Sequence, residues 1–464
     1  MELSTVNDVL ADVHRDRLWI VLAEVSAGSA GFVTQLESWG AAGVIVVAGA
    51  PGVGEQPDAR VVFTQAEASA TMMEGMRQFF RSVMDPDDEV AAAVNAFDPR
   101  GEALVTLPDV HVAKRVFGRP VYGARSAETQ ALEDKTLIDE LWDTADVDRV
   151  PSEVVPVHEA PAAAARLSQG QGTVWAADNL LGWHGGGTYT QWIRPSADLD
   201  DAVAWFAACS RSVRVMPFLD GIPCSIHGFV TRSGVASFRP VEMLTLRRPD
   251  RAFLYGGVAS YWDPTAADRA HMREVARRVA AELGDRIGYL GPFSVDGVMT
   301  VEGFRPTELN PRMSAGMGQL ASTVDGLQLG SIVRCLREGD LEVDPQWLER
   351  VVLESADENR VGGAYTVAQG RPFPQDRLEE FPVSIRYEGG RVSRAEESEA
   401  NGSIVGGNNP AGAYVRLNPD PERIDHGPSL GPMAVALMEF ADAEWDLGIG
   451  PVEAAPDLRA AAIS

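Results

Sequence analysis

Short apolar runs that alternate with a helical stretch mark the first quarter of the chain. Leu18–Val25, Val44–Ala48 and Val61–Phe63 are almost entirely apolar, and Phe32–Trp39 places its apolar residues at helical spacing. Such runs between helices are typical of parallel strands that are buried on both faces of a sheet. The pattern therefore predicts a small α/β domain over residues 1–118.

The pattern changes after the turn-rich segment 118–123 (GRPVYG). Downstream, alternating or apolar segments predict strands, and apolar positions three and four residues apart predict helices. The predicted helices are Thr129–Trp142, Ala160–Leu167, the amphipathic Arg269–Leu283 and Pro432–Trp445; the predicted strands are Pro151–Val157, Val174–Ala177, Val213–Asp220, Ser225–Thr231, Ala236–Leu246, Val383–Tyr387 and Ala413–Leu417. We expect a central unit over residues 119–335 and a C-terminal α+β domain over residues 336–464.

Composition and charge disfavour some classes of partner and indicate the compartment of the protein. The chain has 464 residues, 45% hydrophobic and 23% charged, which is an ordinary globular composition. Its formal net charge of −27 disfavours binding to nucleic acid or to an anionic membrane surface, so we expect neither partner. Three widely spaced cysteines, an N-terminus without an apolar leader and no apolar run that could span a bilayer predict a soluble cytoplasmic protein.

Residues 293–310 carry the clearest chemistry. They are predicted to form a β-hairpin that turns at Glu302-Gly303. Alternation places Glu308 and Asn310 on one face of the second strand, and the turn brings Asp296 of the first strand beside them. Two carboxylates and an amide oxygen form a hard-oxygen site that suits Mg²⁺, with Mn²⁺ as an alternative.

Acidic residues on a hairpin are usually solvated side chains and not metal ligands. The residues that follow this hairpin distinguish the two cases. Arg312 follows Asn310 by two residues and so lies on the same face, and a Ser-Ala-Gly loop comes next. A guanidinium beside a metal suits a substrate carboxylate or an anionic transition state. The combination favours the metal site.

This segment resembles the end of the nucleotide site in the ATP-grasp superfamily of carboxylate–amine ligases. That superfamily has an acidic residue on one strand and an E-x-N-P-R-type strand after it, and Asp296, Glu308, Asn310 and Arg312 match residue by residue. The resemblance implies an ATP-grasp core over residues 119–335, preceded by an α/β pre-ATP-grasp domain. It also implies that the first three residues hold metal ions and that Arg312 is catalytic.

Two further motifs follow the order of the superfamily. Lys135, one of only two lysines in the chain, follows Asp134 and resembles the lysine that reaches the ATP phosphates. Gly185, Gly186 and Gly187 resemble the glycine-rich loop that covers those phosphates. The resemblance therefore implies nucleotide contacts for all four, and a catalytic role for Lys135.

The segment that would meet the adenine base matches the superfamily less closely. Segment 215–221 (VMPFLDG) resembles the hinge whose backbone meets the adenine edge, which implies nucleotide contacts for Met216, Phe218 and Asp220. Glu242 lies on a strand where the superfamily places phosphate contacts. The second lysine that the superfamily has before the glycine loop is absent from residues 173–178. We therefore expect an altered nucleotide cradle.

The favoured function is an ADP-forming, ATP- and Mg²⁺-dependent ligase that joins a small-molecule carboxylate to an amine, both of them amino acids or peptides. The layout of pre-domain, core and C-terminal domain is similar to the pheganomycin-type peptide ligases of bacterial secondary metabolism, which suggests peptide bond formation in antibiotic biosynthesis. A carboxylase-like or purine-pathway ATP-grasp enzyme is one alternative, and a non-catalytic nucleotide-binding or partner-binding protein is another. A homodimer is compatible with the sequence, which does not fix the oligomeric state.

Overall fold

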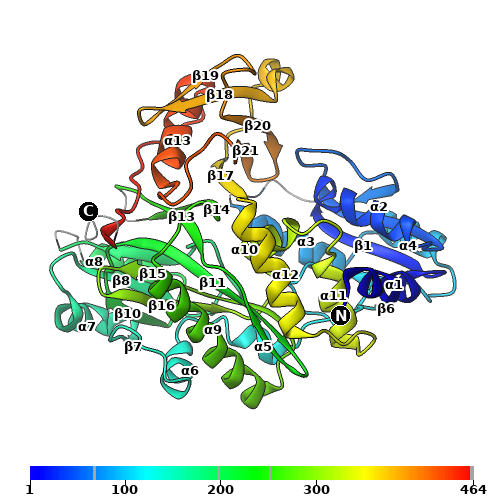
Figure 1. Ribbon diagram of the computed structural model, residues 1–464, viewed down its shortest axis with the longest axis horizontal. Coiled ribbons are helices and arrows are strands. Elements are labelled where there is room, and N and C mark those ends of the chain that lie inside the picture. Colours follow the sequence, from blue (N-terminus) through cyan, green and yellow to red (C-terminus); the bar gives the residue numbers. More distant parts are fainter. Residues whose placement is uncertain (66–68, 70, 196–198, 250–251, 460–464) are drawn as a thin grey trace.

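The computed structural model describes residues 1–65, 69, 71–195, 199–249 and 252–459. Within these ranges the strands form two four-stranded sheets, one eleven-stranded sheet and a two-stranded hairpin. Figure 1 shows the N-terminal layer at one side of the molecule, with the C-terminal strands rising from the middle. This mixture of a parallel sheet, antiparallel sheets and helices confirms the predicted fold class. None of the helices in the described ranges combines the length and apolarity needed to cross a membrane.

The N-terminal sheet is parallel, as its apolar runs predict, with the order β3-β2-β1-β4. Trp19 and Val21 pack with helices α1 and α2 on one face, whereas Ile20 and Leu22 pack with α3 and α4 on the other. Burial on both faces explains why these strands are apolar throughout. The elements are α1 Leu3–His14, β1 Leu18–Val25, α2 Ala30–Ser38, β2 Gly43–Ala50, β3 Arg60–Phe63, α3 Met72–Met84, α4 Asp88–Phe97 and β4 Leu104–Thr106.

A joint segment leads from this sheet to the second one and departs from its prediction. Thr129–Trp142 is not one helix but two short ones, α5 Ala127–Ala131 and α6 Ile138–Thr144, after the hairpin of β5 Arg115–Val116 and β6 Arg119–Pro120. In the intervening turn, the Asp134 carboxylate accepts hydrogen bonds from the backbone nitrogen and the hydroxyl of Thr136, at 2.9 and 2.7 Å. Such local bonds compete with helical ones and explain the break.

The second four-stranded sheet is antiparallel and holds the glycine-rich segment between two of its strands. Its order is β7-β10-β8-β9. Helices α7 and α8 bury Ala163 and Phe206 against Trp175 and Val213 of the sheet. The elements are β7 Glu153–Pro156, α7 Ala160–Leu167, β8 Thr173–Ala177, β9 Thr190–Ile193, α8 Leu199–Ala207 and β10 Ser212–Pro217. The strands and the helix that the sequence predicts here are confirmed.

The eleven-stranded sheet joins the central and C-terminal parts of the chain. Its order is β16-β15-β11-β13-β14-β17-β21-β20-β18-β19, with β12 beside β11. Strand β17 of the predicted C-terminal domain is hydrogen-bonded to β14, so the division at residue 335 stays a prediction. The predicted strand Ala236–Leu246 is wrong in one respect, because it is split at residues 238–240. The strands are β11 Ile222–Thr231, β12 Gly234–Ser237, β13 Val241–Arg247, β14 Phe253–Ala259, β15 Gly291–Thr300, β16 Gly303–Asn310, β17 Gly362–Gln369, β18 Val383–Glu388, β19 Arg391–Arg394, β20 Gly402–Asn409 and β21 Gly412–Pro419.

Helices cover this sheet at the positions that the apolar spacing indicates. Helix α9 (Ala266–Ile287) buries Met272, Val279 and Leu283 against the central strands. The Thr265 hydroxyl caps its first turn, and Gly288 ends it with a left-handed φ of 59°. Helix α13 (Gly431–Trp445) covers the C-terminal strands. The remaining helices are α10 Ala315–Ser322, α11 Leu329–Glu338 and α12 Pro345–Glu358.

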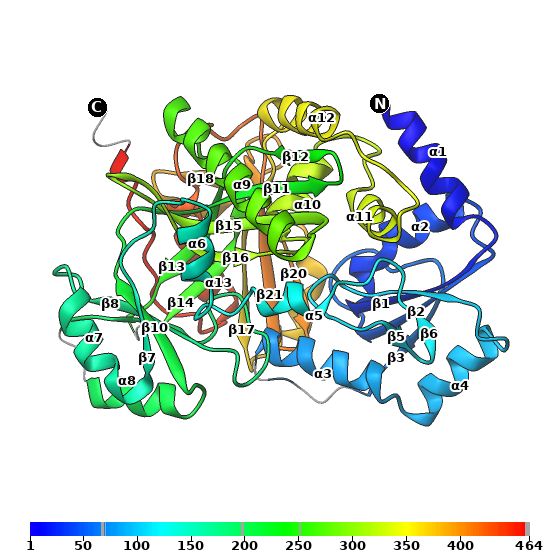
Figure 2. The same ribbon diagram turned by 90° about the horizontal axis from the view of Figure 1, so that it is seen from below.

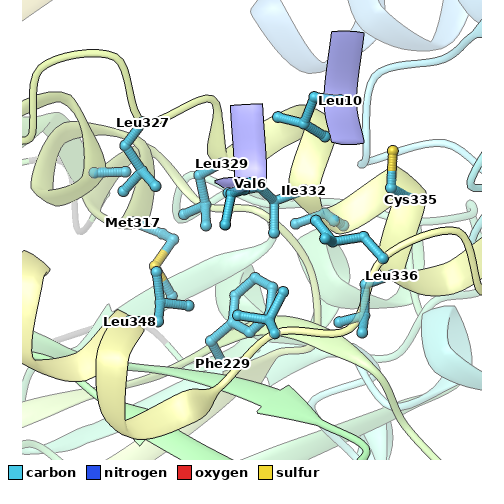
Figure 3. Close-up of a cluster of buried hydrophobic side chains, with 14 of the residues drawn as sticks. Val6, Leu10, Phe229, Met317, Leu327, Leu329, Ile332, Cys335, Leu336 and Leu348 are labelled. Carbon is cyan, nitrogen blue, oxygen red and sulfur yellow. The ribbon is translucent and has the colours of Figure 1, made fainter. Parts of the chain in front are cut away.

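One buried cluster fixes the N-terminal layer to the rest of the molecule. Val6 and Leu10 of α1 pack on Ile332 and Leu336 of α11, with Phe229 of β11 beneath them (Figure 3). All five side chains are at most 1% exposed. Burying an apolar side chain of this size contributes about 1.5–3 kcal/mol. The cluster therefore holds the N-terminal layer against the central sheet.

Candidate functional site

The β15–β16 hairpin brings the three predicted metal ligands together. In its register Asp296 lies opposite Glu308, and Ser294 lies opposite Asn310. The Asn310 amide nitrogen donates to the Asp296 carboxylate at 2.9 Å. The two carboxylates and the amide therefore occupy one face, as the alternation predicts, and all three side chains line a cavity of about 390 Å³.

The charges at this face favour a bound cation. Burial, together with the neighbouring charge of Glu308, raises the pKa of Asp296 to about 6. The Ser225 hydroxyl, at 2.6 Å, counteracts part of that shift. Two adjacent carboxylates in a buried place repel each other, and a divalent cation relieves that repulsion. The pair therefore fits Mg²⁺.

The supply of protein ligands for this cation is small. No group of three or more His, Cys, Asp or Glu side chains in the described ranges is arranged to hold a metal ion. The Asn310 amide oxygen accepts from Arg312 Nη2 at 2.9 Å, so it faces away from the carboxylates. It would serve as a ligand only after a half-turn of the amide. A metal at this face would take its other ligands from water and substrate phosphates, as Mg²⁺ commonly does.

Lys135 enters the same cavity from the turn between α5 and α6. Its Nζ lies 3.0 Å from Glu308 Oε1, and the side chain is 6% exposed. The ammonium makes no hydrogen bond of good geometry with the described residues. A buried cation with unused donors beside a carboxylate pair suits an anionic ligand such as a phosphate.

The glycine-rich segment lies over this part of the cavity. Gly185, Gly186 and Gly187 all line it, and the last two have φ values of +62° and +78°, which favour glycine. A Cβ at Gly186 would meet nothing within 4 Å, so the backbone itself is the exposed surface. Burial and the charge of Lys135 lower the pKa of the adjacent His184 to about 4, which keeps this imidazole neutral near pH 7.

Arg312 is held by a buried carboxylate that the sequence analysis did not assign to the site. Arg312 Nε donates to Glu133 Oε2 at 2.8 Å, and the same carboxylate accepts from Arg125 and from the indole of Trp183. The guanidinium also lies over the Trp183 ring, 5.2 Å from its centroid. These contacts fix Arg312 at the cavity wall beside Asn310. The position of Glu133 two residues before Lys135 was the available signal.

The predicted hinge forms an apolar end of the cavity. Met216 and Phe218 line it, and the Phe218 ring stacks on Trp192 with centroids 3.9 Å apart. The Arg247 guanidinium lies 5.0 Å from the centre of the Phe218 ring. Asp220 forms an ion pair with Arg247 at 2.6 Å and is not among the residues that line the cavity. The hinge thus presents an apolar surface to the cavity, whereas Asp220 lies outside the cavity wall, where it bonds Arg247 and Gln171.

Glu242 lies elsewhere, contrary to the expectation that it contacts the nucleotide. Its carboxylate accepts from the Leu430 backbone nitrogen at 2.8 Å and from the Ser429 hydroxyl, at the start of α13. The physical reason is the alternation of β13: Met243 and Thr245 face the cavity, so Glu242 faces the C-terminal helix. Burial raises the pKa of Glu242 to about 7.

A buried arginine stands near the place of the missing lysine. Arg214 of β10 pairs with Ala176 of β8 in the sheet register, which is the strand where a lysine was expected. Its guanidinium is fully buried, bonds Asp139 at 2.7–2.9 Å and lines the cavity. A single arginine within an apolar strand (Val213-Arg-Val215) was the signal for it.

The comparisons identify the fold. No family model matches the chain, and no curated protein matches it in sequence. Among solved structures, a carboxyaminoimidazole ribonucleotide synthase from Aspergillus clavatus, complexed with ATP, superposes with a TM-score of 0.52 at 12% identity, covering 93% of this chain and 99% of that one. The biotin carboxylase domain of Hydrogenobacter thermophilus 2-oxoglutarate carboxylase, with MgADP and bicarbonate, superposes with a TM-score of 0.52 at 12% sequence identity. The match covers 92% of this chain and 90% of that one. Rhizobium etli pyruvate carboxylase superposes with a TM-score of 0.56 at 15% sequence identity, covering 92% of this chain and 37% of that one. The chain has the ATP-grasp fold.

Proposed function

We propose that this protein, with its ATP-grasp fold, is an ADP-forming ligase that activates a carboxylate with ATP and transfers it to an amine. The observation that carries the proposal is one cavity that brings together an acidic pair, a buried lysine, a glycine-rich backbone and a fixed arginine. These are the groups that phosphoryl transfer needs, because positioning and charge stabilisation supply most of its catalysis.

Each residue of the cavity is assigned the role that its chemistry suits. Asp296 and Glu308, with Asn310 after rotation of its amide, would hold Mg²⁺, which would neutralise the charge that develops during phosphoryl transfer. Lys135 and the backbone of Gly185–Gly187 bind phosphate oxygens. Met216 and Phe218 contact the adenine base. The guanidinium of Arg312 orients the substrate carboxylate.

The reaction has two balanced steps. A carboxylate oxygen attacks the γ-phosphorus, the bond to the β-phosphate oxygen breaks, and ADP leaves with an acyl phosphate formed. The amine nitrogen then attacks the acyl carbon, phosphate leaves, and the nitrogen loses a proton. Arg312 stabilises the oxyanion of the tetrahedral intermediate, and the glycine-rich segment excludes water that would hydrolyse the acyl phosphate.

We further propose that both substrates are amino acids or peptides, joined by a peptide bond, in the secondary metabolism that produces antibiotics. The support is the layout, in which β17 of the C-terminal region contributes Tyr365 to the cavity wall. The apolar side chains of Met72, Met73 and Met76 also line the cavity, and methionines adapt to varied apolar side chains.

A carboxylase-like activity is a second candidate, and the structural neighbours are the observation that favours it. Two of them are a carboxylase and a biotin carboxylase domain, one with bicarbonate bound. Bicarbonate would then replace the organic acid and would react with ATP to give carboxyphosphate. The two candidates share the nucleotide site and differ only in the acid.

One experiment distinguishes these functions. The protein is mixed with ATP, Mg²⁺ and either pooled amino acids or bicarbonate, with hydroxylamine as a general amine. Amino-acid-dependent ADP release with a hydroxamate product supports the ligase, whereas ADP release that depends on bicarbonate alone supports the carboxylase-like activity. If neither addition releases ADP, both candidates are wrong.

A further inference from the structure

A second cavity of about 620 Å³ adjoins the first and has no role in the chemistry above. The two cavities share Val110 and Trp183 in their walls. Trp183 therefore lies between them, with its ring under the Arg312 guanidinium and its indole nitrogen bonded to Glu133. The second cavity therefore adjoins the first on the side where Arg312 lies.

Helix α3 contributes side chains to the walls of both cavities. Met72, Met73 and Met76 line the first cavity, whereas Arg77 and Arg81 line the second. Residues four apart lie on one helix face about 6 Å from each other along the axis. Figure 2 shows α3 below the strands of the N-terminal layer, with one end toward the middle of the molecule. Helix α3 thus presents methionine side chains to the first cavity and two guanidiniums to the second.

Neither of these arginines has a carboxylate partner among the described residues. Arg77 Nη1 donates to the Leu181 backbone oxygen at 3.0 Å, and the Arg81 side chain makes no hydrogen bond or ion pair with the described residues. Glu74 also lines the cavity and has its own contacts. His111 lines it as well, 3.3 Å from Glu24 and stacked on Phe80.

We infer that the second cavity binds the free carboxylate of the amine substrate, an amino acid or a peptide, through Arg77 and Arg81. The carboxylate of the acid substrate is consumed at the metal site, so a carboxylate held away from that site belongs to the amine partner. Guanidiniums bind carboxylates through paired, charge-assisted hydrogen bonds. The side chain of the same substrate then lies against the methionines of α3 and the ring of Phe80. This inference rests on the proposed ligase function and adds the chemical class of its amine substrate.

The test compares amine substrates with and without a carboxylate. The acid is first identified by hydroxamate formation, and the amines offered are then pooled amino acids or the matching amino-acid amides. The wild-type protein is expected to have a KM about 10–100-fold lower for the acids than for the amides, since a charge-assisted hydrogen bond is worth that factor. The variant is Arg81→Gln, because Arg77 also holds Leu181. The matched control is Arg391→Gln, an exposed arginine on β19 away from both cavities.

Arg81→Gln is expected to raise the KM for the amino acids about 10-fold while leaving the KM for the amides and for ATP unchanged. Arg391→Gln is expected to leave all three unchanged. Equal use of acids and amides by the wild type, an equal effect of both variants, or selective use of a phosphorylated amine would each overturn the inference. Absence of any hydroxamate would instead show that the proposed ligase function is wrong, which separates the two failures.

Discussion

Neutralising Glu133 tests whether this buried carboxylate holds the active-site arginine. Its side chain is 1% exposed and accepts from Arg125, from Arg312 and from Trp183. Glu133→Gln keeps the shape but removes the charge between two buried guanidiniums. Breaking a buried ion pair in this way costs about 3–5 kcal/mol. We expect about 3 kcal/mol, the lower end of that range, because Arg125 keeps the Asp109 backbone oxygen and Arg312 keeps Asn310.

Differential scanning calorimetry measures this loss. For a chain of 464 residues that unfolds as one unit, the unfolding entropy is about 1 kcal/mol/K, so the midpoint should fall by about 3 °C. Glu153→Gln is the matched control, because Glu153 forms an ion pair with Arg166 at the surface. Exposed pairs contribute little, so its midpoint should change much less. Equal shifts for the two variants would refute the role of Glu133.

The pH dependence of the unfolding midpoint tests the role of Glu133 a second time. Burial opposes ionisation of Glu133, but the charges of Arg312 and Arg125 outweigh it and hold the pKa of that carboxyl below its usual range. A carboxyl whose folded pKa lies below its unfolded value of about 4.3 stabilises the protein above that pH and loses the effect as the pH falls through the folded pKa. The midpoint difference between wild type and Glu133→Gln should therefore be constant near pH 7 and shrink below about pH 4.

Substitutions at three further residues test the assigned roles. Arg312→Ala is expected to keep ATP binding, measured with a fluorescent nucleotide, and to lower kcat about 100-fold or more because an oxyanion donor is lost; equal loss of binding and turnover would contradict this role. Lys135→Ala should raise the KM for ATP about 10-fold, the effect of one charge-assisted bond, and Lys135→Arg should not restore it because a planar fork replaces a point charge. Glu308→Ala should abolish the dependence of nucleotide binding on Mg²⁺ in a titration with EDTA as control; an unchanged metal dependence would place the metal elsewhere.

The metal face was predictable because it depends on local geometry. A hairpin with a short turn fixes which residues lie opposite each other, and strand alternation fixes which face they share. Asp296 and Glu308 therefore meet as the sequence predicts. The N-terminal parallel sheet was predictable for a similar reason, since burial on both faces leaves apolar runs in the sequence.

The remaining features depend on contacts between distant segments. Glu133 meets Arg312 across 179 residues of sequence, and no local pattern reports such a pair. Alternation puts Glu242 on the opposite face of β13 from Met243 and Thr245, but which of the two faces meets the cavity is set by the packing of α13 on β13, which no local pattern reports. The continuous sheet from β14 to β17 is likewise a long-range pairing.

The central claim is that ATP activates a carboxylate as an acyl phosphate in the cavity beside Arg312. The most direct measurement uses an acid substrate labelled with heavy oxygen in its carboxylate, with mass spectrometry of the phosphate that is released. We predict ADP, an amide product and phosphate that carries one labelled oxygen from the acid. Release of AMP and pyrophosphate, or unlabelled phosphate beside an amide product, would contradict it.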